Sequence, residues 1–129
     1  MRKFEFQKAY EEIEIAGNVY RVDFSDAKIK EYQQEFFAFQ DDIKKLESVD
    51  ETKLSEEDQW KHFEELKTLV KKIINTVLGE DSFEPLYKAA GKSVMNMLDL
   101  VWHLAEIVND RKTRNLEDKK SKYVKGKKK

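Results

Sequence analysis

Two stretches near the start of the chain alternate between apolar and polar residues. Ile13 and Ile15 are each preceded by a glutamate, and this period of two is typical of a half-buried strand. Gly17-Asn18 follows, a pair suited to a tight turn, and residues 19–24 alternate again. We therefore predict a β-hairpin, with residues 3–6 as a candidate for a further short strand. A lone hairpin is marginally stable in water, so it is expected to pack against other elements.

Beyond the hairpin, apolar residues recur every three to four positions, which predicts helices. Ser25, Ser55 and Ser93 stand where N-caps are expected, and Gly79 stands where a helix would end. Pro85 suits the first turn of a short helix. The predicted helices span about residues 26–47, 56–78, 85–90 and 94–108.

The apolar faces of these helices predict how they pack. The inward face of the second helix is expected to run from Trp60 through Phe63 and Leu66 to Val77. The last helix is the most apolar and is expected to be central, with Trp102 on its flank. The predicted fold is therefore α+β and mainly α, with an N-terminal β-hairpin packed on a bundle of three long helices and one short helix.

Charge divides the chain into two unequal parts. Residues 111–129 hold ten lysines and arginines against two acidic residues, a net charge of +8. Residues 1–110 carry a net charge of −9. The terminal stretch is too poor in apolar residues to offset the entropy of ordering it. We predict a single domain over residues 1–110 and a flexible, disordered basic C-terminal arm over residues 111–129.

Composition restricts the chemistry and the compartment. The chain has no cysteine, so disulfides, thiolate metal sites and thiol catalysis are excluded. No apolar run resembles a signal peptide or approaches the roughly 20 residues of a membrane span. We expect a cytoplasmic protein of a bacterial host with no membrane partner.

The candidates for catalysis are weak. His62 and His103 each follow an aspartate by four residues, so a metal site between helices is one hypothesis, against a partly buried histidine beside surface carboxylates. The glycines are isolated from one another and form no phosphate-binding loop, and no serine lies in a nucleophile elbow. We predict no catalytic, cofactor-binding or metal-binding residues, no cofactor, and a protein that is not an enzyme.

Aromatic residues are the more informative feature. Phe36, Phe37 and Phe39 cluster on the first predicted helix, and neighbours 100° apart cannot all face one core layer. Either this helix is covered on two sides, or part of the cluster binds a partner. The candidate partner-binding residues are Phe36, Phe37, Phe39, Trp60 and Trp102.

The order of features resembles a family of phage proteins. Residues 13–26 (IEIAGNVYRVDFSD) and residues 78–87 (LGEDSFEPLY), the latter leading into a long apolar helix, are similar to the tail assembly chaperones of siphophages that infect Gram-positive bacteria. The resemblance covers roughly residues 10–108. It implies a protein that binds the tape measure protein, keeps it soluble during tail assembly, and helps recruit tail tube subunits. Homo-oligomers are an expected form.

Two other functions remain open from the sequence. The basic arm suits a small nucleic-acid-associated regulatory protein, with weak, salt-sensitive contacts to phosphates. Helix-borne carboxylates such as Glu64 and Glu65 are the basis for a metal-dependent, all-helical nucleotide hydrolase.

Overall fold

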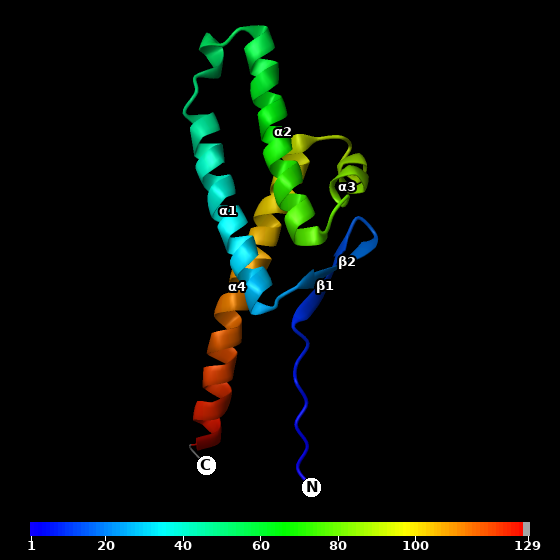
Figure 1. Ribbon diagram of the computed structural model, residues 1–129, viewed down its shortest axis with the longest axis vertical. Coiled ribbons are helices and arrows are strands. Elements are labelled where there is room, and N and C mark those ends of the chain that lie inside the picture. The colour runs from blue at the N-terminus through cyan, green and yellow to red at the C-terminus, as the bar shows by residue number, and fades with distance from the viewer. Residues whose placement is uncertain (128–129) are drawn as a thin grey trace.

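The computed structural model describes the backbone of residues 1–127 and the side chains of residues 1–112. It confirms the predicted fold class (Figure 1). Two antiparallel strands, β1 (Tyr10–Ile15) and β2 (Asn18–Asp23), precede the helices α1 (Asp26–Glu47), α2 (Glu56–Leu78), α3 (Phe83–Ala89) and α4 (Val94–Lys127). A 3₁₀ turn, η1 (Glu51–Lys53), joins α1 to α2.

The hairpin turn differs from the prediction by one residue. β1 pairs with β2 so that Ile13 lies opposite Tyr20 and Ile15 opposite Asn18. Ala16 and Gly17 therefore form the turn, with φ of 52° and 81°, and Asn18 is the first residue of β2. Positive φ at both central positions is what a type I′ hairpin requires, and the sequence alone suggests Gly17-Asn18 for them.

The predicted third strand over residues 3–6 is absent. Residues 1–8 have no regular secondary structure, and Phe4 and Phe6 are exposed. Where this segment meets β1, Arg111 of α4 donates a hydrogen bond to the carbonyl oxygen of Lys8 at 3.0 Å, and its guanidinium lies over the ring of Phe24. Arg111, the first residue of the predicted arm, thus packs against the hairpin.

Helix ends follow the local chemistry. Ser55 and Ser93 accept hydrogen bonds from the backbone N–H groups of Asp58 and Asn96, both at 3.2 Å. Ser25 occupies the N-cap position of α1, but its side chain makes no capping hydrogen bond. Gly79, at φ 112°, ends α2 as predicted. Such a backbone conformation is open to glycine and strained for other residues.

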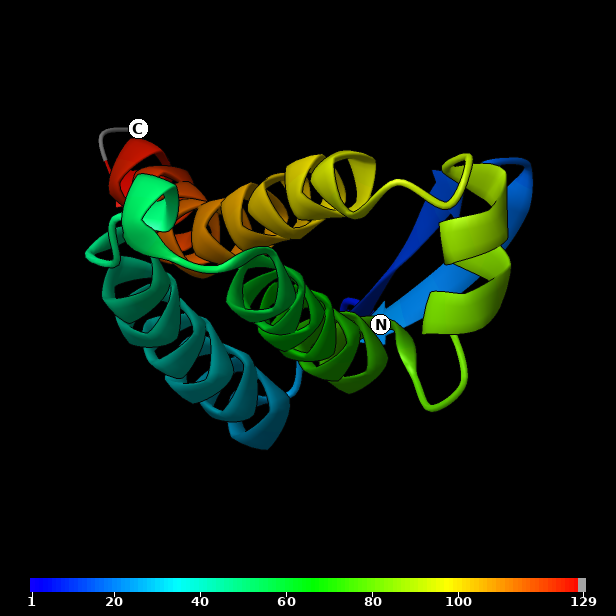
Figure 2. The same ribbon diagram turned by 90° about the horizontal axis from the view of Figure 1, so that it is seen from above.

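The core lies where α1, α2 and α4 meet, and where α3 and β2 cover the C-terminal end of α2 (Figure 2). Val70, Ile74 and Val101 are fully buried there, and Phe83 brings α3 into the same cluster. The loop between α2 and α3 is held by Asn75, whose side-chain oxygen accepts from the backbone N–H of Phe83 at 3.0 Å.

α4 continues past the point where its apolar period ends. The sequence pattern predicts an end near Val108, whereas the helical backbone runs to Lys127. Residues 111–127 are rich in lysine, arginine and other residues of high helix propensity, which supports a helix without an apolar face. The flexibility of the arm stays a prediction, and its last two residues lie outside the described part of the chain.

Candidate partner-binding surface

The hairpin of α1 and α2 extends beyond the start of α4. In Figure 1 the connected ends of α1 and α2 project past α3 and past the first turn of α4, while the N-terminus and the C-terminal end of α4 lie at the opposite end. We call this projecting part, residues 43–66, the hairpin tip. α1 and α2 lie on two sides of the apolar interior of the tip, and α4 borders it only at its beginning, through Met95 and Leu98.

One groove follows this open interior, and we call it the seam groove. It has a volume of about 520 Å³ and lies between α1 and α2, next to Met95 and Leu98 at the beginning of α4. Its floor is apolar, and its edge carries Glu47, Glu51 and the ring of Trp60. The apolar side chains of the floor are Ile43, Leu46, Phe63, Leu66 and Leu98.

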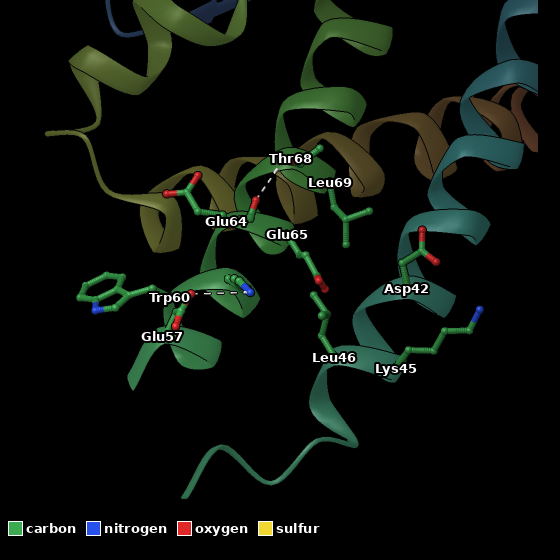
Figure 3. A pocket seen from close by; sticks show the side chains of 10 residues that line it. Asp42, Lys45, Leu46, Glu57, Trp60, Glu64, Glu65, Thr68 and Leu69 are labelled. Atoms are coloured by element: carbon green, nitrogen blue, oxygen red, sulfur yellow. Dashed lines mark hydrogen bonds and ion pairs between the residues drawn. The ribbon is translucent and has the colours of Figure 1, made fainter. Parts of the chain in front are cut away.

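A second groove of about 850 Å³, the outer groove, lies on the opposite face of α2 (Figure 3). Glu65 of α2 and Leu46 of α1 face each other there, and the ring of Trp60 points away from α1. Its walls carry both signs of charge, including a Glu57–Lys61 ion pair at 3.8 Å. Such exposed pairs are well solvated and contribute little to stability, so the outer groove differs from the seam groove chiefly in carrying lysines as well as acidic residues.

Hydrogen bonds fix the connection at the end of the tip. The Gln59 side-chain amide donates to the backbone oxygens of Glu51 and Leu54, at 3.0 and 3.2 Å. The Asp50 carboxylate caps η1 by accepting from the backbone N–H of Thr52 at 3.0 Å. These bonds hold the connection against α2, so the tip is a structured surface.

His62 belongs to this surface. Its Nδ1 lies 3.3 Å from a Glu51 carboxylate oxygen, and its buried Nε2 has no hydrogen-bond partner. The acidic residue beside the His62 ring is therefore Glu51, whereas the sequence spacing suggests Asp58. Within residues 1–112, no three histidine or acidic side chains are grouped closely enough to hold a metal ion.

The five aromatic candidates separate into two groups. Phe36 and Phe39 are buried in the core, and Trp102, at the surface, packs edge-on against Phe39 with ring centroids 5.5 Å apart. Phe37 and Trp60 are exposed, at 68% and 62% of their surfaces. Phe37 and Trp60 therefore expose the most ring surface among the five, and Trp102 exposes less because one face packs on Phe39.

Trp60 differs most from its predicted place. The α2 periodicity predicts that it faces inward at the start of the apolar stripe, but no described element covers that part of the stripe. Phe63 and Met95, not predicted as binding residues, are exposed beside it, and the Trp60 and Phe63 rings contact edge-to-face at 5.9 Å. The sequence does indicate that one end of α2 is uncovered. The apolar stripe of α2 is longer than the predicted apolar stripe of the last helix, so the last helix cannot cover all of it.

Phe37 lies on a separate and smaller patch. It lines a hollow of about 200 Å³ between α1 and α4, together with the polar side chains Gln33, Gln40 and Asn109. The mixed lining and small volume make this hollow a weaker binding surface than the seam groove.

Comparison with protein-family models, with curated proteins and with solved structures finds no match to this chain. Within the described residues, no helix is both long enough and apolar enough to cross a membrane. A function for the chain therefore has to be inferred from its sequence pattern and from the geometry of its surface.

Proposed function

We propose that the protein is a phage tail assembly chaperone, a non-enzymatic protein that binds the tape measure protein and keeps it soluble during tail assembly. The observation that carries the binding function is the exposed apolar cluster of Trp60, Phe63 and Met95 around the seam groove. Contiguous apolar patches with polar rims mark protein-binding sites on soluble proteins. The order of hairpin, helices and loop motifs along the sequence supports the particular class of client.

The kind of side chain at this surface suits a client with many similar apolar segments. Trp60 offers a large ring with few rotatable bonds, and Met95 adapts its shape to different neighbours. Burying an apolar side chain of this size contributes about 1.5–3 kcal/mol. Three such residues provide reversible binding with tolerance for differences between client segments.

The rest of the molecule would keep such a complex in solution. Charged residues make up 40% of the chain, and residues 1–110 carry a net charge of −9. The net charge of the whole chain is only −1, so solubility of the complex would rest on the high density of hydrated surface charges and not on net charge. The tail tube protein and further copies of this chain are additional proposed partners.

The test is co-expression of this chain with the tape measure protein of a siphophage that infects Gram-positive bacteria. We expect the tape measure protein to become soluble and to co-purify with the chain after nuclease treatment. Trp60→Ala combined with Phe63→Ala should return it to the insoluble fraction. Val19→Ala, at an exposed apolar residue on the hairpin, is the matched control and should have no effect.

Two outcomes would contradict the proposal. One is a tape measure protein that stays insoluble beside the unchanged chain. The other is a chain whose only ligand is nucleic acid, lost on nuclease treatment or on removal of residues 111–129, which would favour the regulatory alternative.

A further inference from the structure

The seam groove continues the site that α4 fills. Along the base of the hairpin, Val70 of α2 is buried together with Met97 and Val101 of α4. α4 begins at Val94, yet the apolar surfaces of α1 and α2 continue beyond it to Leu46 and Phe63. A groove between two helices that a third helix already fills at one end has the shape to accept another helix at the other end.

The length of the groove sets the size of that helix. Residues 59–66 of α2 line it, and at 1.5 Å per residue this span is about 10 Å, or roughly two turns. A helix lying along it would place apolar side chains at positions i, i+3 or i+4, and i+7 on the floor.

Charge at the groove restricts the helix further. Glu47 and Glu51 are at its edge, and among the described residues that line it there is no lysine or arginine. The outer groove, by contrast, carries Lys45 and Lys61 among its acidic residues. Because opposite charges across an interface favour association and like charges oppose it, the seam groove selects for basic residues beside the apolar stripe.

His62 adds a polar position to the same groove. Its ring lines the groove, and its Nε2 is buried without a hydrogen-bond partner. Buried polar atoms are nearly always paired, and each unpaired one calls for an explanation. This nitrogen is already covered by the protein itself, so it lies out of reach of a bound helix and does not help to select one.

We propose that the seam groove binds one amphipathic helix of a partner protein, with its apolar stripe on the groove floor and lysine or arginine residues beside the stripe, facing Glu47 and Glu51. This inference rests on the proposed protein-binding function and specifies the part of the client that is recognised.

The test is an NMR titration of the full-length, methyl-labelled protein with three synthetic peptides. The first is a helical peptide with leucines at i, i+4 and i+7 and lysines beside them. The second has glutamate in place of each lysine, and the third has a central proline that breaks the helix. We expect the first peptide to shift the methyl signals of Ile43, Leu66 and Leu98, which line the seam groove and not the outer groove. The glutamate peptide should bind at least about tenfold more weakly, and the proline peptide should not bind.

Charge reversal provides the matched control. Glu47→Lys leaves one positive and one negative charge at the groove edge and should abolish the preference for the lysine peptide, whereas Glu14→Lys, at an exposed acidic residue of β1, should not change it. Equal affinity for both peptides would overturn the inference, and so would shifts confined to the outer groove. It would also be overturned if the same methyl signals moved with the concentration of the protein alone, since a second copy would then fill the groove.

The two proposals can fail separately. A chain that solubilises the tape measure protein while its groove methyl signals stay unchanged would contradict the helix-binding groove only. A groove that binds the lysine peptide in a chain that fails to solubilise the tape measure protein would contradict the chaperone function only.

Discussion

The two ends of the α1–α2 hairpin have the same helical pattern and opposite environments. At the base, Ile74 is 0% exposed, because α4, α3 and β2 cover that end of α2. At the tip, Phe63 is 37% exposed, although it continues the same stripe. Periodicity therefore shows which side of a helix is apolar, while the start of the neighbouring helix decides how much of that side is covered.

The largest expected effect is at the base. Ile74→Ala removes a fully buried side chain and leaves a cavity, which should lower the free energy of unfolding by about 2–5 kcal/mol. Met95→Ala, at an exposed apolar residue of α4 beside the tip, should change it by no more than about 0.5 kcal/mol. Urea unfolding followed by circular dichroism measures both, and equal losses would show that the tip is as well covered as the base.

A pH effect of similar size is expected from Tyr32, a buried residue of α1. Burial, with Asp23 and Glu31 nearby, raises the pKa of Tyr32 from 10.0 to about 12. The unfolded chain therefore releases this proton at lower pH than the folded chain. The contribution of the protonated Tyr32 hydroxyl to the free energy of unfolding is complete below pH 10 and is lost as pH rises from 10 towards 12.

Two pKa units correspond to a loss of about 2–3 kcal/mol. Unfolding measured at pH 9 and pH 11.5, with Tyr32→Phe as the control, checks this expectation. If the unchanged protein and Tyr32→Phe lose equal stability between pH 9 and pH 11.5, then the pKa of Tyr32 is the same in the folded and the unfolded chain.

A smaller effect should distinguish two similar helix starts. Ser55→Ala removes the side-chain cap of α2 at the tip and should cost about 1 kcal/mol. Ser25→Ala, at the N-cap of α1, removes no capping hydrogen bond and should cost little. Thermal unfolding of both variants measures the difference, and the reverse order would contradict the cap assignments.

The smallest change in stability is expected at Trp60. Trp60→Ala alone should alter the free energy of unfolding by about 0.5 kcal/mol or less, because the ring is 62% exposed. It should nevertheless weaken binding to the tape measure protein, measured by pull-down. A large loss of stability would mean that the ring supports the fold.

The sequence predicted the fold more completely than the surface. The bounds of α1 follow from local patterns, as does the end of α2 at Gly79. The environment of Trp60 does not, because it depends on α4, which begins 34 residues later in the chain. Exposure also depends on tertiary packing for the aromatic cluster of α1, which consists of Phe36, Phe37 and Phe39. Their spacing indicates that they cannot all face one way, but only the packed structure shows that Phe37 is the exposed member.

Hydrogen–deuterium exchange of the full-length protein, free and bound to the tape measure protein, tests the central claim most directly. If the open tip is the binding surface, exchange should slow at residues 43–47 and 59–66 and at the start of α4, with no change in the buried base around Ile74. Slowing confined to the β-hairpin or to residues 111–127, with the tip unchanged, would contradict the account.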